Sequence, residues 1–328
     1  MRAAEDQIRS LPVTSLVAVA SHSFPKNPTL REELLRRYPN STFNETRVPL
    51  AGTELVSFLQ GHPKAITGLE VLDDSVFSAL PALKVVSKYG VGLDTIDLVA
   101  AERHGVSVRW TPGVNRQSVA ELTIAFMIWL ARNIDSASRD LRNGTWTAGH
   151  GRQLSSATVG VLGCGHVGQT VARLARAFGS RVIAHDIQHY DAFYRDAGVV
   201  PVSLATLLAE SDFVTVHVPL DSSTRGMIGA SQLEAMKPSA FLVNTARGGI
   251  IDEEALKRVL MRGTLAGAAF DVFAAEPPAD TELLLLPNFV GTPHIGGSST
   301  EAVLAMGRAA IEGLDDDSRA ISSKNRPV

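Results

Sequence analysis

Short strand-like and helix-like segments alternate along most of the chain, and this alternation constrains the fold more than any other feature. An apolar run at 16–20 precedes a helical pattern at 29–38, and the same order recurs at 42–48 and 53–59, at 65–67 and 74–80, and at 85–88 and 95–104. Parallel strands need a crossover between them, and a helix usually supplies it. The pattern therefore predicts an α/β fold built on a parallel sheet.

A second series of the same kind follows a break. Pro112 and Gly113 interrupt the pattern, a long helical stretch covers 118–142, and a polar segment runs to residue 156. Strands are then predicted at 158–162, 181–185, 212–218, 240–245, 266–272 and 289–291, with helices at 166–178, 204–210, 231–236, 253–262 and 300–313. We predict two doubly wound domains, in which a flavodoxin-like domain (1–114 and 299–328) is interrupted by a Rossmann domain (115–298).

Composition narrows the class of protein. Among 328 residues, 45% are apolar and 20% charged, and the net charge of −3 provides no basic field for nucleic acid or an anionic membrane. The single cysteine, Cys164, permits no intramolecular disulfide, and Glu5 and Asp6 stand where a signal peptide needs positive charge. The longest apolar stretch, 122–131, is too short to span a bilayer. We expect a cytoplasmic protein without nucleic-acid or membrane partners, and we identify no metal site.

The motif Gly163-Cys164-Gly165-His166-Val167-Gly168 follows a predicted strand and opens a predicted helix. In such a loop the first glycine allows a tight turn, the second lets the backbone approach a pyrophosphate, and the third lets the helix pack on the strand. Asp186 ends the next strand, where a carboxylate binds the adenosine ribose and disfavours a 2′-phosphate. The motif predicts NAD as cofactor. His166 either approaches the phosphates or lies on the surface.

Three functional side chains follow the ends of predicted strands in the second series. They are Arg247, Glu276 and His294. The carboxyl ends of the strands in a doubly wound sheet are where ligands bind, so we expect these residues to surround one site. Hydride transfer to a carbonyl needs a proton donor, which histidine supplies, and a cation for the substrate's charge, which arginine supplies.

Several segments in this order resemble one family, the D-isomer-specific 2-hydroxyacid dehydrogenases, and in particular the D-3-phosphoglycerate dehydrogenase-like members without a C-terminal regulatory domain. Besides the glycine loop, the segments are Lys88-Tyr89-Gly90-Val91-Gly92-Leu93-Asp94, Thr111-Pro112-Gly113 with Ala120-Glu121-Leu122-Thr123, Asn244-Thr245-Ala246-Arg247-Gly248-Gly249, Phe270-Asp271-Val272-Phe273 with Glu276-Pro277, and Thr292-Pro293-His294-Ile295-Gly296-Gly297.

The resemblance implies an NAD-dependent oxidoreductase that interconverts a small D-2-hydroxy acid and its 2-oxo acid. It implies that Arg247 binds the substrate carboxylate and carbonyl, that His294 is the general acid/base, and that Glu276 pairs with His294. The implied substrate contacts are Lys88, Tyr89, Val91, Gly92, Arg247 and His294. The implied cofactor contacts are Gly163, Gly165, His166, Val167, Gly168, Asp186, His217, Val218, Pro219, Thr245, Ala246, Arg247, Asp271, His294, Gly296 and Gly297, with Asp271 facing the nicotinamide carboxamide.

The chain departs from the phosphoglycerate-specific pattern at the far end of the substrate. Gly68-Leu69-Glu70 and Thr147-Ala148 lack arginines that are common there, while Lys88 can still meet a phosphate as a point charge. A substrate with a second anionic group, phosphate or phosphonate, stays open beside an unphosphorylated hydroxy acid. Alternative functions are hydroxypyruvate/glyoxylate reductase, phosphite dehydrogenase and an NAD-sensing corepressor-like binding protein.

The helix predicted at 118–142 is apolar on more than one face. Family members bury the corresponding helix against a twofold partner, so the resemblance implies a homodimer through the region 118–152. Burial of the helix within one subunit is the alternative.

Overall fold

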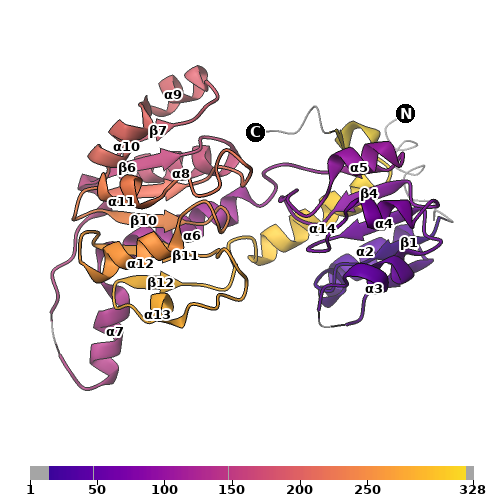
Figure 1. Cartoon of the computed structure of the whole chain (residues 1–328), viewed down its shortest axis with the longest axis horizontal. Helices are drawn as coiled ribbons and strands as arrows, with labels where there is room; N and C mark the ends of the chain where they lie inside the picture. The colour runs from indigo at the N-terminus through magenta and orange to yellow at the C-terminus, as the bar shows by residue number, and fades with distance from the viewer. Residues whose placement is uncertain (1–14, 47, 147, 323–328) are drawn as a thin grey trace. The chain divides into compact units, whose positions relative to one another are not determined.

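The structure, a computed structural model, describes residues 15–46, 48–146 and 148–322. Glu5, Asp6 and Thr147, on which expectations above rest, lie outside the described residues. Contacts divide the chain into two compact units. The first unit comprises the chain up to Asn115 together with the segment from Thr300, and the second unit comprises Arg116–Ser299. Figure 1 shows one sheet with its helices in each unit.

The first unit contains a sheet in the order β13-β5-β4-β3-β1-β2. Its strands are β1 (Val17–Val19), β2 (Ser41–Phe43), β3 (Lys64–Thr67), β4 (Val85–Lys88), β5 (Ser107–Arg109) and β13 (Ala320–Ile321). All neighbouring strands are parallel except β13, which pairs with β5 in the antiparallel sense. The strand order β2-β1-β3-β4-β5 is that of flavodoxin-like folds, whose topological switch point lies between β1 and β3.

Helices cover both faces of this first sheet. One core contains side chains of α3 (Gly52–Leu59), α4 (Asp74–Ser78) and α5 (Leu98–Arg103). The other contains those of η1 (Phe24–Lys26), α2 (Pro28–Arg37) and α14 (Thr300–Gly313). The short helix η3 (Asp317–Arg319) precedes β13. Asn27, Asp73 and Asp97 begin α2, α4 and α5 as N-caps, because each side chain accepts a hydrogen bond from a first-turn N–H.

The second unit contains a parallel sheet in the order β12-β11-β10-β9-β6-β7-β8. The strands are β6 (Thr158–Leu162), β7 (Arg181–His185), β8 (Val200–Pro201), β9 (Phe213–Val216), β10 (Phe241–Asn244), β11 (Gly267–Phe270) and β12 (Phe289–Gly291). This is the Rossmann order with one added strand. The predicted fold class, two doubly wound parallel-sheet domains, is confirmed.

Two cores lie on the two faces of the second sheet. One includes side chains of α6 (Arg116–Ala131), α8 (His166–Ala177) and α9 (Asp191–Ala197), with η2 (Leu154–Ser156) at its margin. The other includes those of α10 (Leu204–Glu210), α11 (Ala230–Glu234), α12 (Glu253–Met261) and α13 (Thr281–Leu284). Strands covered on both faces read as continuous apolar runs, which is why the sequence located every strand of this sheet except the exposed β8.

The structure corrects two local predictions and adds elements that were not predicted. The single helix predicted at 118–142 is wrong, because α6 ends at Ala131 and α7 (Ile134–Arg142) begins after Asn133, whose φ of 51° interrupts the helix. The strand predicted at 42–48 ends at Phe43, because the Asn44 side chain donates to Ala20 O and accepts from Thr46 N and so turns the chain. The helices α9 and α13 and the strands β5, β8 and β13 were not predicted.

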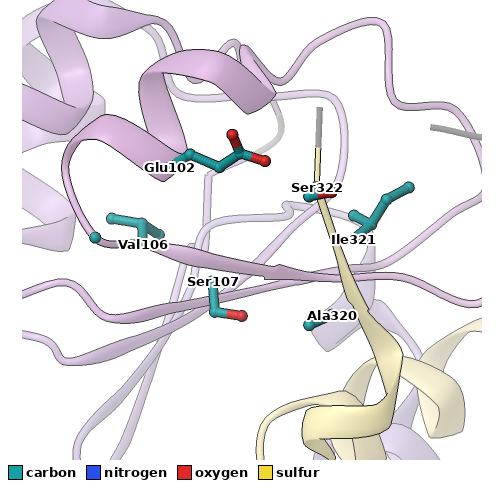
Figure 2. A pocket seen from close by; sticks show the side chains of 7 residues that line it. Glu102, Val106, Ser107, Ala320, Ile321 and Ser322 are labelled. Carbon is teal, nitrogen blue, oxygen red and sulfur yellow. The ribbon is translucent and has the colours of Figure 1, made fainter. Parts of the chain in front are cut away.

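The described residues contain no helix with the length and apolar character that a membrane crossing requires. A pocket of the first unit lies where Gly105, Val106 and Ser107 meet Ala320–Ser322 (Figure 2). It adjoins the amino end of β5, whereas doubly wound sheets bind ligands at the carboxyl ends of their strands. The functional residues predicted from the sequence do not line it.

Candidate active site

Arg247, Glu276 and His294 are all placed by one edge of the second sheet. They follow β10, β11 and β12, which are adjacent and parallel, so the loops that carry the three side chains leave the sheet at the same end. Among the smaller electrostatic contributions to the pKa values of the pair, the positive charge of Arg247 favours ionised Glu276 and disfavours protonated His294.

His294 and Glu276 form a direct pair. Nδ1 of His294 lies 2.8 Å from Oε2 of Glu276, and Oε1 of Glu276 accepts a hydrogen bond from Phe273 N at 3.1 Å. The hydrogen bond to Glu276 raises the pKa of His294 above its ordinary value, although burial acts in the opposite direction. Burial alone would raise the pKa of Glu276, but the hydrogen bond from His294 holds it below its ordinary value. The pair therefore favours a charged imidazolium beside a carboxylate.

The backbone at His294 is held in an uncommon conformation. Its φ of 54° lies in the left-handed region, which residues other than glycine rarely adopt. The buried carboxylate of Asp271 supports this turn by accepting hydrogen bonds from Thr292 Oγ1 (2.5 Å), Ile295 N (2.7 Å) and Gly296 N (2.7 Å), while Asp271 O accepts from His294 N. Such strain persists where the surroundings over-determine it, and it clusters at functional sites.

The Arg247 loop is fixed by an asparagine to which the sequence reasoning gave no role. Asn244, at the end of β10, accepts from Ala246 N at 3.1 Å and donates from Nδ2 to Arg247 O at 2.9 Å. Arg247 Nη1 in turn donates to Ala246 O at 2.7 Å. An asparagine at the end of a buried strand is the available signal, because its side chain can hydrogen-bond backbone groups a few residues ahead.

The Arg247 loop also packs tightly on the Glu276 loop. A Cβ added to Gly248 would lie 1.9 Å from both the carbonyl carbon and oxygen of Phe273, and 2.4 Å from Ala274 N. Only a glycine permits this approach of two backbones. The loops carrying Arg247, Glu276 and His294 are therefore interlocked, through Gly248 against Phe273 and through Glu276 against His294.

The glycine loop has the geometry that a dinucleotide requires. Gly163 has a φ of 90°, and a Cβ on Gly168 would meet Gly163 O at 2.0 Å, so the start of α8 packs directly on the loop. A Cβ on Gly165, by contrast, would meet no atom within 4 Å. The open side of the loop thus adjoins the amino end of α8, where backbone N–H groups favour a phosphate.

Asp186 and His217 lie on either side of the glycine loop. Asp186 accepts hydrogen bonds from Cys164 N (2.5 Å) and Gln188 N (2.8 Å). The turn at Gly163 packs against the backbone of His217 and Val218. Burial lowers the pKa of His217 to about 3, and its Nδ1 has no hydrogen-bond partner among the described residues. The residues around this loop therefore fit NAD, because they combine an open phosphate site, a carboxylate for the ribose and an unsatisfied buried nitrogen.

The remaining predicted cofactor residues are on the same end of the second sheet. Val167 is half-buried, His166 is exposed in the first turn of α8, and Thr245 Oγ1 lies 2.8 Å from Thr123 Oγ1. Pro219 is exposed and follows Val218, while Ala246, Gly296 and Gly297 belong to the loops already described. Their contacts with NAD remain predictions.

The four predicted substrate residues outside this sheet lie at the end of β4 and in the segment after it, in the first unit. Lys88 is buried, and its ammonium donates to Gly68 O and to Thr95 Oγ1. Tyr89 packs edge-on against Phe24, and Val91 O accepts from Trp110 Nε1 at 2.9 Å. Val91 and Gly92 are half-buried. Their roles toward a substrate remain predictions. Across the described part of the chain, no three His, Cys, Asp or Glu side chains are grouped so as to hold a metal ion.

A known protein family matches the second unit of the chain. The model of the D-isomer specific 2-hydroxyacid dehydrogenase NAD binding domain matches residues 124–296. A glyoxylate reductase of Korarchaeum cryptofilum is 41% identical over 250 residues, which are 74% of this chain and 75% of that protein. A D-3-phosphoglycerate dehydrogenase of Methanocaldococcus jannaschii is 42% identical over 249 residues. These residues are 75% of this chain but only 47% of that relative.

Solved structures resemble the whole described fold. A D-lactate dehydrogenase of Aquifex aeolicus, solved in complex with NAD and lactic acid, superposes with a TM-score of 0.79 at 26% identity, covering 91% of this chain and 93% of that one. The likeness extends over both units of the chain.

Proposed function

The chain belongs to the D-isomer-specific 2-hydroxyacid dehydrogenase family, and we propose that it transfers a hydride between NAD(H) and a small D-2-hydroxy acid or its 2-oxo acid. The observation that supports this most directly is the grouping of Arg247 with the Glu276–His294 pair at the carboxyl ends of three adjacent strands. The same sheet carries the glycine loop and Asp186.

Each of the three side chains has one task in this proposal. Arg247 binds the substrate carboxylate and draws electron density toward the carbonyl oxygen. His294, with Nδ1 held by Glu276, directs Nε2 at that oxygen and donates a proton as the alkoxide develops. Glu276 keeps the imidazole charged and oriented. The bound nicotinamide supplies the hydride for reduction and accepts it for oxidation.

The cofactor contacts proposed for this chain follow from the glycine loop. Backbone N–H groups at Gly165, His166 and Val167 would face the pyrophosphate. Asp186 would accept the adenosine ribose hydroxyls and repel a 2′-phosphate, and Ile187 and Gln188 add no cation. The carboxylate that selects NAD over NADP is thus Asp186.

We propose that the substrate is unphosphorylated. Glu70 follows β3 at the switch point of the first sheet, is 1% exposed, and uses Oε2 to accept from Gly68 N at 2.6 Å. Its Oε1 has no hydrogen-bond partner within the described residues. The loop after β3 thus carries a buried carboxylate and no cation that could bind a phosphate, and the ammonium of Lys88 is already engaged by Gly68 O and Thr95 Oγ1. Hydroxypyruvate and glyoxylate fit better than a phosphorylated acid.

A panel of substrates tests the reaction and the choice of substrate together. NADH oxidation is measured with hydroxypyruvate, glyoxylate, phosphonopyruvate and 3-phosphohydroxypyruvate, and NAD reduction is measured with phosphite. We expect kcat/KM for hydroxypyruvate or glyoxylate to exceed that for the phosphorylated acid by about tenfold or more, which corresponds to about 1.4 kcal/mol or more in transition-state binding. Turnover of phosphite alone, or of no compound, would contradict the proposed reaction.

The pH dependence of reduction should report the His294–Glu276 pair. Reduction needs His294 protonated, so its rate should persist above the ordinary histidine pKa and fall as the pH rises through the raised pKa. Glu276→Gln removes the carboxylate that raises this pKa, and the fall should then occur at lower pH. The measurement is kcat/KM for the 2-oxo acid from about pH 5 to about pH 10, a range wide enough to include the titration of a histidine with a raised pKa. An unchanged profile would show that another group titrates.

We propose further that the protein is a cytoplasmic homodimer that pairs through the region 118–152. The helix α7 buries no residue in its own unit, and Figure 1 shows it extending away from the sheet of that unit. Apolar side chains of this region are exposed, with 58% of Leu141 and 88% of Trp146 accessible. Such a surface on an extended arm is typical of an interface. Sedimentation velocity should show twice the mass of one chain, and a monomer would contradict the proposal.

A further inference from the structure

The loop that carries Glu276 is held by a residue that the proposed reaction does not use. Glu253 Oε1 accepts a hydrogen bond from Ala274 N at 2.6 Å, directly before the turn to Glu276. The same segment is packed against Gly248. The backbone at Ala274 thus contacts both a carboxylate of α12 and the Arg247 loop.

Glu253 is not needed to cap its own helix. The N-cap of α12 is Asp252, whose carboxylate accepts from Ala255 N at 2.9 Å. Glu253 is half-buried, and burial together with the charges of Asp280, Asp252 and Glu254 raises its pKa, while the hydrogen bond from Ala274 opposes that rise. Burial and the neighbouring acids disfavour an ionised Glu253, and the hydrogen bond from Ala274 N offsets part of that cost. The Glu253 side chain is therefore engaged by the loop rather than by its own helix.

The far end of the Glu276 loop is anchored by a second residue of α12. Lys257 contacts Asp280 Oδ2 at 2.7 Å, and it also approaches Glu254 and Glu282. Asp280 itself begins α13 as the N-cap. The segment from Ala274 to Asp280 is therefore tied to α12 at both ends, with Glu276 between the two ties.

We propose that Glu253 is a positioning residue that sets the place of Glu276, and through it the orientation and charge of His294. This inference rests on the proposed function for its kinetic consequence. Without the Glu253 acceptor, Ala274 loses its tie and the backbone leading to Glu276 gains freedom. The Glu276 carboxylate then holds His294 less closely, which lowers the histidine pKa, and a misplacement of about 1 Å can cost up to about a hundredfold in rate.

Three variants test the proposal. Glu253→Ala removes the acceptor, and Glu253→Gln retains an oxygen that can accept from Ala274 N. Glu254→Ala is the matched control, because Glu254 is exposed in the same turn and forms an ion pair with Lys257. We expect Glu253→Ala to lower kcat for the 2-oxo acid by about 10- to 100-fold with the KM for NADH nearly unchanged. Glu253→Gln should restore most of the rate, and Glu254→Ala should resemble the parent.

A readout independent of turnover separates this inference from the proposed reaction. The pKa of His294 is followed by NMR in protein labelled at histidine, with His294→Asn used to assign the resonance. Glu253→Ala should lower that pKa, whereas Glu253→Gln and Glu254→Ala should not. If the parent reduces no 2-oxo acid but the pKa falls in Glu253→Ala, the proposed reaction fails and the positioning role stands. Folded Glu253→Ala protein with an unchanged His294 pKa would overturn the positioning role, as would equal losses in Glu253→Ala and Glu253→Gln.

Discussion

Replacing His294 with alanine is expected to lower kcat by about 10²- to 10⁴-fold, the usual contribution of a general acid/base. His294 has Nδ1 fixed by Glu276 at 2.8 Å, so the proton that reaches the substrate must leave from Nε2. Neither water nor Arg247 can replace it near neutral pH, because water is a weak acid and a guanidinium does not release its proton. Because the glycine loop and Asp186 supply the main contacts proposed for the dinucleotide and are unchanged in this variant, the KM for NADH should change little.

The backbone at His294 requires a second variant. At a φ of 54°, alanine adds a strain of about 1 kcal/mol to the folded state, whereas asparagine tolerates the left-handed region. His294→Asn should therefore lose turnover as severely as His294→Ala but remain closer to the parent in thermal stability. His62→Ala, a partly exposed histidine of the first unit, is the control and should keep parent kinetics. A kcat within about threefold of the parent in His294→Asn would remove His294 from the proposed role.

Much of the fold could be predicted because its signals are local. A buried parallel strand such as β6 is a continuous apolar run, and α8 begins at a glycine motif and is closed by Gly179, whose φ is 94°. The strand ends then indicated where Arg247, Glu276 and His294 would lie, since adjacent parallel strands bring their carboxyl ends together. These inferences need only the order of elements along the chain.

What could not be predicted depends on contacts between distant residues. The break at Asn133 falls within a continuous helical pattern, and only the backbone conformation reveals it. Glu253 reads as an ordinary first-turn acid of a helix, and its contact with Ala274 exists because the loop after β11 folds back over α12. The carboxylate of Asp271 was expected to face the nicotinamide, yet it also accepts three hydrogen bonds from the His294 loop, which no local pattern discloses.

Gly248 has the same dependence on a distant contact, and it gives the second large effect. Gly248→Ala would place a methyl group 1.9 Å from the Phe273 carbonyl, which is backbone and cannot turn aside as a side chain would. One of the two loops must then move. Overpacking of this kind should lower the free energy of unfolding by about 3 kcal/mol. Displacing Arg247 from Glu276 by about 1 Å should also lower kcat/KM by about a hundredfold or more.

Urea unfolding and steady-state kinetics of Gly248→Ala would be compared with those of Gly229→Ala. A Cβ on Gly229 would meet its nearest neighbour at 3.6 Å, which is an ordinary contact. Because Gly229 is the N-cap of α11, this control should lower the free energy of unfolding by no more than about 1 kcal/mol, the usual effect of changing an N-cap residue. Gly248 has no left-handed φ, so any larger loss must come from the collision rather than from backbone preference. If Gly248→Ala matched Gly229→Ala in both measurements, the Arg247 and Glu276 loops would not be interlocked, and the position of Arg247 beside the Glu276–His294 pair would have to depend on Asn244 alone.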